Sequence, residues 1–264
     1  MPEFGTLLLE WRGDVAVLTL DRPESLNAIN QAMHAELKQA FDAIEARSEL
    51  RGLIVTGAGR GFCAGQDLSE RKPLPEGHKY DLSLSIEENY IPLITRLTNL
   101  GCPTIALVNG VAAGAGASLA VATDMIVATK SARFILAFSK IGLGPDAAIS
   151  FHLPQRIGSA RAKAMMMTAA PIDAATAKDW GLIWEIVPDE GAADEVARLC
   201  KWLNSAPTAA LRAVRSLVDA SGANDLQAQM ALEAQTQKAL GYTEDYTEGV
   251  SGFLEKRAAK FVGR

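Results

Sequence analysis

The sequence predicts an α/β fold, and two observations carry that prediction. Over roughly its first half, short apolar segments of strand length alternate with a segment of helical periodicity and a small-residue helix. From residue 191 onward, alanine, leucine and charged residues at helical spacing predominate. This order is typical of parallel strands connected by helices, followed by a helical region.

The first half contains the clearest strand and helix patterns. DVAVLTLD at Asp14–Asp21 is β-branched and leucine-rich, and it ends at an Arg-Pro turn, so it is predicted to be a strand. A helix should follow from Asn30, because apolar residues recur there at helical spacing. The other predicted elements of this half are strands at 52–57, 103–110 and 125–129 and a helix at 116–124.

The second half is predicted to be mainly helical. One helix covers Ser159–Ala170, and a second begins after an N-cap at Asp173 and ends at Gly181. A last short strand is expected at Leu182–Val187. From Gly191 onward we expect about three helices, which could project from the core. The segment Lys72–Tyr80, with two prolines and a glycine, is predicted to be a mobile surface loop.

Charge and composition exclude several classes of protein. A net charge of −5 provides no basis for binding nucleic acid or an anionic membrane. Three widely spaced cysteines favour free thiols in a reducing compartment, and acidic residues near the N-terminus argue against an export signal, so a cytoplasmic location is expected. Thr104–Thr123 has the length of a membrane span, but its alanine, glycine and asparagine content argues against one.

The common motifs for cofactors and metals are not found. TGAGRGFCAGQDL at 56–68 follows a strand, but its glycines do not have the dinucleotide-binding spacing, and there is no P-loop or nucleophile elbow. His34, His78 and His152 are isolated in the sequence, with no metal-ligand spacing around them. We therefore expect no metal and no separate cofactor.

Two predicted strands are each followed by a turn of small residues, Ala64–Gly65–Gln66 and Gly114–Ala115–Gly116. Glycine and alanine allow a ligand to approach the main chain, and a helix that begins after such a turn directs free N–H groups outward. Amides from the two turns could therefore converge on one carbonyl oxygen and form an oxyanion hole. Close packing between helix and strand explains the small residues equally well.

The two motifs GFCAGQDL and NGVAAGAGASLA resemble the crotonase (enoyl-CoA hydratase/isomerase) superfamily, and the likeness runs from LTLDRPESLNAIN to EGVSGFLEKRAAKF. The resemblance implies a ββα spiral core with an acyl-CoA site over residues 1–200. It also implies a helical region over 201–264 that assembles homotrimers or dimers of trimers. The substrate would be an acyl-CoA thioester, so coenzyme A is part of the substrate. The oxyanion donors would be the amides of Gln66 and Ala115.

The resemblance also implies which residues contact coenzyme A or the acyl group. Phe253 and Lys256 would reach the ligand from a neighbouring subunit. Tyr90 is either part of the acyl pocket or packed between helix and core. The full set of expected contacts is Leu26, Ala28, Ala64, Gly65, Asp67, Leu68, Tyr90, Gly114, Phe138, Phe253 and Lys256.

The reaction depends on the acids and bases around this site. Hydratases of the family use two glutamates, and the matching positions here are Ser118 and Phe138, which transfer no proton at neutral pH. The nearest acid is Asp146, in FSKIGLGPDAAISF, which would serve as the catalytic base. Alternatively, Asp146 is only the N-cap of a following helix.

An aspartate at this place resembles the 1,2-epoxyphenylacetyl-CoA isomerases of phenylacetate catabolism, so an isomerase is favoured over a hydratase. The chain departs from that pattern at Ala147, Ala148 and Ile149, where glycines are expected, and at Ile91, where an asparagine is expected. Double-bond migration, as in fatty acid metabolism, therefore stays open, as do hydration and thioester hydrolysis. Dehalogenation is disfavoured because no histidine lies near Ile91. A non-catalytic CoA-binding relative is a further alternative, and Cys63 is expected to be a buried thiol.

Overall fold

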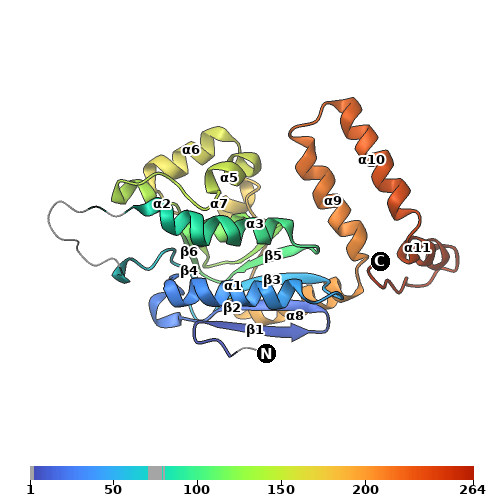
Figure 1. The fold of residues 1–264 in the computed structure, drawn as a ribbon, viewed down its shortest axis with the longest axis horizontal. Coiled ribbons are helices and arrows are strands. Elements are labelled where there is room, and N and C mark those ends of the chain that lie inside the picture. The colour runs from blue at the N-terminus through green and yellow to red at the C-terminus, as the bar shows by residue number, and fades with distance from the viewer. Residues whose placement is uncertain (1–2, 71–78, 80) are drawn as a thin grey trace.

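The computed structural model describes residues 3–70, 79 and 81–264. Two sheets form the centre of the fold (Figure 1). The larger has six strands in the order β1 (Leu7–Arg12), β2 (Val15–Leu20), β3 (Gly52–Gly57), β5 (Thr104–Val108), β7 (Met125–Thr129) and β10 (Glu185–Val187). The smaller has four, in the order β4 (Gly61–Cys63), β6 (Val111–Ala113), β8 (Arg133–Ile135) and β9 (Ile172–Asp173).

The two sheets are built by a repeated step along the chain. Three times, a strand of the larger sheet is followed directly by a strand of the smaller one, as β3–β4, β5–β6 and β7–β8. Helices then lead to the next repeat. Within the larger sheet, β3, β5 and β7 pair in parallel with one another, and within the smaller sheet β4, β6 and β8 do the same. Strand β2 also pairs in parallel with β3, whereas β1–β2 and β8–β9 are antiparallel. This alternation confirms the predicted α/β class with a ββα spiral core.

Helices cover both faces of the larger sheet. On one face, Val196, Leu199 and Leu203 of α8 pack against apolar residues of the central strands. Helix α1 covers the other face and lies in front of the sheet in Figure 1. The described helices are α1 (Gln31–Glu45), α2 (Leu82–Ser85), α3 (Ile91–Asn99), α4 (Ala115–Val121), α5 (Ile149–Ile157), α6 (Ser159–Thr168), α7 (Ala174–Asp179), α8 (Ala192–Ser205), α9 (Thr208–Ser221), α10 (Leu226–Leu240) and α11 (Glu244–Leu254).

Most predicted elements are confirmed, and their local signals explain them. The side chain of Asn30 accepts a hydrogen bond from the amide of Met33 and so caps α1, whose apolar face is buried. Asp173 caps α7 in the same way through the amide of Thr176. The predicted strands at 14–21, 52–57, 103–110 and 125–129 are all present as β2, β3, β5 and β7.

Some elements differ from the prediction. Strand β1 was not predicted, and it pairs antiparallel with β2. The expected strand Leu182–Val187 begins only at Glu185, because the amides of Leu182 and Ile183 bind the carbonyl oxygen of Ala177 at the end of α7. The helix expected at 116–124 ends at Val121. Four helices rather than three follow residue 191, since Gly241 also ends a helix.

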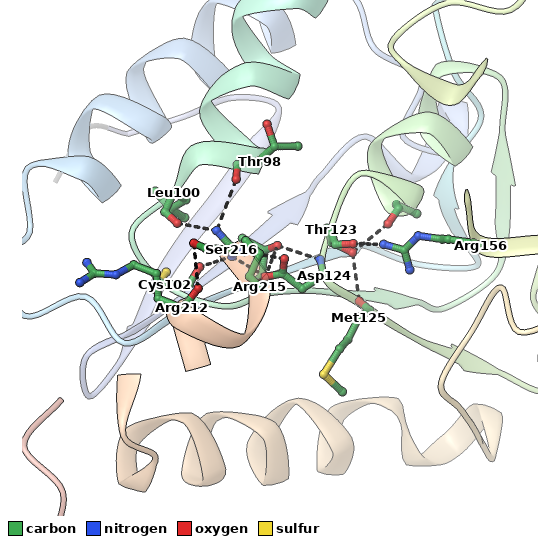
Figure 2. Close-up of polar contacts among 12 residues, drawn as sticks. Thr98, Leu100, Cys102, Thr123, Asp124, Met125, Arg156, Arg212, Arg215 and Ser216 are labelled. Carbon is green, nitrogen blue, oxygen red and sulfur yellow. Dashed lines mark hydrogen bonds and ion pairs between the residues drawn. The ribbon is translucent and has the colours of Figure 1, made fainter. Parts of the chain in front are cut away.

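The last three helices stand apart from the sheets (Figure 1). Helix α8 runs across residue 200 and packs on the sheet, so the projecting part begins with α9. The guanidinium group of Arg215 anchors α9 to the core, where it binds both carboxylate oxygens of Asp124 and the carbonyl oxygens of Leu100 and Cys102 (Figure 2). The loop predicted at Lys72–Tyr80 lies outside the described residues, apart from Lys79. Within the described part of the chain, no helix is long and apolar enough to span a membrane.

Candidate active site

The two small-residue turns lie against each other at the ends of β4 and β6. Gly65 and Gly114 both have positive φ, at 92° and 49°, which favours glycine at these positions. A Cβ atom on Gly65 would lie 2.8 Å from the carbonyl oxygen of Ala113 and 3.3 Å from the amide nitrogen of Ala115. Side chains are therefore excluded here first of all because one turn packs against the other.

Close packing also explains the next glycine. A Cβ atom on Gly116 would lie 2.3 Å from the carbonyl oxygen of Cys63 and 2.7 Å from its sulfur. The first turn of α4 thus rests directly on β4. The Cys63 thiol is buried as expected, and burial raises its pKa to about 12, so it is no nucleophile at neutral pH.

The main-chain pattern orients the amide of Gln66. The amide of Ile29 donates to the carbonyl oxygen of Gly65 at 2.8 Å. The amide of Asp67 donates to the carbonyl oxygen of Ile29, also at 2.8 Å. In this parallel bridge Gly65 and Asp67, on either side of Gln66, make both hydrogen bonds to Ile29. The main-chain N–H of Gln66 itself therefore points away from Ile29. Ala115 is the first residue of α4, where an amide has no partner inside the helix.

The side chain of Gln66 is held by two residues that sequence reasoning did not connect with the turn. The hydroxyl of Tyr90 donates to Gln66 Oε1 at 2.7 Å, and His34 Nε2 lies 3.3 Å from the same oxygen. His34 looked isolated in the sequence. The available signal was its place on α1 beside the buried Met33 and Leu37, which directs it into the core.

Asp146 lies in the loop before α5, next to α4. Its side chain is half-buried and atom Oδ1 is shielded from solvent, while its main-chain oxygen accepts a hydrogen bond from Ser118 Oγ at 3.2 Å. The N-cap position of α5 is occupied by Ala148, not by Asp146. The alternative that Asp146 is the N-cap residue is therefore wrong.

The backbone that follows Asp146 is unusual for its residues. Ala147 and Ala148 have φ values of 49° and 61°, in the left-handed region that favours glycine. This conformation turns the chain from the Asp146 loop into α5. Ala147 and Ala148 therefore cost conformational free energy directly beside Asp146, the candidate base.

Ser118 lies on α4, and the ring of Phe138 lies near Gly114 at the start of that helix. Ser118 Oγ also donates to the carbonyl oxygen of Gly114 at 3.2 Å, and the Phe138 ring atom Cζ would lie 3.9 Å from a Cβ on Gly114. Both residues are buried. Neither supplies an acid, so the proton chemistry of this region depends on other residues.

Several of the expected coenzyme A contacts gather at the first turn. The amide of Ala64 donates to the carbonyl oxygen of Leu26 at 2.9 Å, and Arg22 binds the carbonyl oxygen of Ala28 and the carboxylate of Asp67. Hydrogen bonds from Ser69, and next those from Arg22, hold the pKa of Asp67 below its usual value. Leu68 follows with a largely exposed side chain.

Phe253 and Lys256 are not brought to this site by their own chain. They lie at the end of α11, at the opposite end of the molecule from β4 and β6 (Figure 1). The side chain of Phe253 is exposed. Among the described residues, no group of three or more His, Cys, Asp or Glu side chains is arranged to hold a metal ion.

This fold and site define a family. The family description "Enoyl-CoA hydratase/isomerase" matches residues 10–264, and the chain belongs to this family, within the crotonase superfamily. Over 250 residues it is 44% identical to the 1,2-epoxyphenylacetyl-CoA isomerase of Escherichia coli, covering 95% of each chain. It is also 44% identical, over 99% of both chains, to a Rhodobacter capsulatus protein named "Probable enoyl-CoA hydratase". The crystal structure of an enoyl-CoA hydratase from Bacillus anthracis superimposes with a TM-score of 0.90 at 28% identity, covering 98% of this chain and 100% of that one.

Proposed function

We propose that this protein is an acyl-CoA isomerase that works through an enolate. The amides of Gln66 and Ala115 bind the thioester oxygen, and Asp146 moves the proton. Coenzyme A arrives as part of the substrate, and no further cofactor takes part.

The single observation that carries the proposal is the set of side chains around the start of α4. Hydration of a double bond needs groups that position and activate a water molecule, and Ser118 and Phe138 provide no carboxylate. Asp146 is half-buried and is held to α4 through its main-chain oxygen. One carboxylate can take a proton from one carbon and return it to another atom, which isomerises the substrate without adding water.

The oxyanion hole would stabilise the intermediate of that transfer. When Asp146 removes a proton next to the thioester, the electron pair moves onto the carbonyl oxygen. Two main-chain amides can stabilise this charge, and donors of this kind contribute about 100-fold to 1000-fold to the rate in other enzymes. Return of the proton at a different position completes the reaction, and the carboxylate is regenerated.

The substrate class has two candidates. The similarity to a 1,2-epoxyphenylacetyl-CoA isomerase supports ring-1,2-epoxyphenylacetyl-CoA, which would open to its oxepin isomer. Ala147 and Ala148, which occupy left-handed positions beside Asp146, add methyl groups where the resemblance leads us to expect glycine. These methyl groups favour a narrower acyl chain, so migration of a double bond in an enoyl-CoA is the second candidate.

We also propose that the active form is a homotrimer or a dimer of trimers. Helices α9 and α10 expose apolar side chains, among them Val214, Val218, Leu226 and Met230. Apolar surface of this kind commonly marks contact with another protein. Another copy would cover it and would also bring Phe253 and Lys256 towards the ligand.

Replacement of Asp146 tests the assignment of the base. Asp146→Asn removes the proton acceptor and keeps the shape, so isomerisation should slow by about 100-fold to 10000-fold, while the thermal midpoint stays close to that of the wild type. Asp179→Asn, at an exposed position of α7, is the matched control and should keep full activity.

The measurement is a panel of 2-enoyl-, 3-enoyl- and epoxyphenylacetyl-CoA followed by mass spectrometry. A product of unchanged mass supports isomerisation. A product heavier by one water from 2-enoyl-CoA contradicts the choice of isomerase, and full activity of Asp146→Asn contradicts the base.

A further inference from the structure

The carbonyl oxygen of the Gln66 side chain is the meeting point of three separate segments. Tyr90, at the end of a π-helical turn at Ile86–Tyr90, donates its hydroxyl proton to Gln66 Oε1 over 2.7 Å. His34 of α1 places Nε2 3.3 Å from the same atom. We call these three residues, His34, Gln66 and Tyr90, the Gln66 clamp.

The clamp is built from buried and mutually packed groups. Tyr90 is 3% exposed and His34 is 8% exposed. Their rings meet edge to face, with centroids 4.8 Å apart and planes at 88°. Both side chains start from helical segments rather than from loops, so their polar atoms have little freedom to move.

The hydrogen positions follow from the surroundings. Burial holds the pKa of His34 below its ordinary value, so the ring is neutral at pH 7. A neutral ring that donates to Gln66 Oε1 carries its proton on Nε2. The amide oxygen of Gln66 has two acceptor sites, and Tyr90 and His34 supply one donor for each.

The backbone of the turn is held on both sides of Gln66, because the carbonyl oxygen of Gly65 accepts from the amide of Ile29 and the amide of Asp67 donates to the carbonyl oxygen of Ile29. Gly65 precedes Gln66 and adopts a φ of 92°, where it has no side chain to fix the turn. Gln66 is therefore fixed by the main-chain bonds on either side of it and, in addition, by the groups that hold its side chain. The clamp holds the only part of Gln66 that extends away from the main chain.

We propose that Tyr90 and His34 are positioning residues for catalysis, which act together with the main-chain bonds to Ile29 to fix the main-chain amide of Gln66 in the direction that an oxyanion requires. This inference rests on the proposed function. An oxyanion donor acts where charge develops in the transition state, so loss of the clamp should lower kcat more than it changes KM.

A double-mutant cycle on Tyr90 and Gln66 tests the proposal. Tyr90→Phe keeps the ring and removes the donor, and Gln66→Met removes the acceptor and keeps the main-chain amide. Each single variant should lower kcat by about threefold to tenfold, the effect of one neutral hydrogen bond, with KM changed by less than about twofold. In the Gln66→Met background, Tyr90→Phe should have no further effect on kcat.

The matched control is Tyr242→Phe, which removes a hydroxyl from a tyrosine that is 82% exposed, and it should leave kcat unchanged. Each variant is checked by circular dichroism and thermal unfolding. If Tyr90→Phe does not fold, the same cycle is measured with His34→Asn in its place.

The outcomes separate the clamp from the proposed function. If the unaltered protein turns over no acyl-CoA, the proposed function is wrong. If the unaltered protein is active and the effects of Tyr90→Phe and Gln66→Met on kcat multiply independently, or if Tyr90→Phe leaves kcat unchanged, the clamp alone is overturned.

Discussion

At the scale of single residues, the site region combines strained backbone with buried polar groups. Ala147 and Ala148 adopt left-handed conformations next to Asp146, and Leu26 and Asn27 do the same before the first turn. Asn27 is fully buried, and its side chain binds the amide of Arg22 and the carbonyl oxygens of Ala58 and Gly61. Such conformations persist because surrounding contacts determine them, and they often occur at functional sites.

The buried His34 predicts how stability depends on pH. Burial is the largest influence on its pKa and lowers it from 6.5, while the hydrogen bond to Gln66 and the charge of Glu70 act in the opposite direction. The unfolded chain therefore binds a proton at a higher pH than the folded one. The free energy of unfolding should fall as the pH drops below 6.5 and should level off once folded His34 is also protonated.

His34→Gln should reduce this loss of stability, as measured by urea unfolding at about pH 8 and about pH 5 at one protein concentration. The pKa of His152 is lowered as well, mainly by burial, so part of the loss should remain in His34→Gln and become smaller in the double variant with His152→Gln. An unchanged difference between the two pH values in His34→Gln would show that His34 does not couple folding to protons.

At the scale of elements, one side chain docks the projecting helices onto the core. Arg215 Nε binds Asp124 Oδ1 at 2.6 Å, and Nη1 binds the carbonyl oxygen of Leu100 at 2.6 Å (Figure 2). Asp124 Oδ2 also accepts bonds from the amide and hydroxyl of Thr104. Asp124 follows α4 and precedes β7, so this cluster joins α9 to the same segment that begins with Ala115.

Arg215→Ala should therefore cost about 3 kcal/mol of unfolding free energy, because it leaves the carboxylate of Asp124 partly buried and without its cation. The measurement is urea unfolding, together with hydrogen exchange of α9 and α10, which should become faster. Arg212→Ala removes an exposed arginine from the same helix and serves as the control, with a change below about 0.5 kcal/mol. Equal effects of the two replacements would contradict the anchoring role of Arg215.

At the scale of the whole molecule, the candidate site is divided between two ends. The two small-residue turns lie at β4 and β6, whereas Phe253 and Lys256 lie at the end of α11 (Figure 1). The arm of α9 and α10 stands away from the sheets and carries exposed apolar residues. In the oligomer proposed above, another copy would cover these residues and bring Phe253 and Lys256 towards the two turns.

Val218→Asp tests this assembly. Val218 is 65% exposed on α9, and a charge there should prevent apolar contact between copies, so light scattering should show a monomer in place of a trimer or hexamer. If Phe253 and Lys256 act across subunits, the KM for acyl-CoA should rise at the same time. Ser216→Asp, at an exposed polar position on α9, is the control and should leave the assembly intact. A wild-type protein that is already monomeric would rule out the proposed oligomer.

The sequence by itself determined the elements whose signals are local. Helix α1 has an apolar stripe and an asparagine cap, β3 and β5 are short apolar runs next to glycine, and the two small-residue motifs indicated the family. These features depend on residues that are neighbours along the chain. The short strands β4, β6, β8 and β9 had no such signal, because two or three residues are too few to show a period.

Only the tertiary structure decided which of these residues meet. His34 and Tyr90 lie 32 and 24 residues from Gln66 in the sequence, and packing alone brings them to one oxygen atom. Packing likewise set the contact of Gly65 with Ala115 and the distance of α11 from both turns. The physical reason is that periodicity and helix caps reflect interactions between residues close together in the sequence. The contacts named here depend instead on how whole helices and strands pack to fill the core.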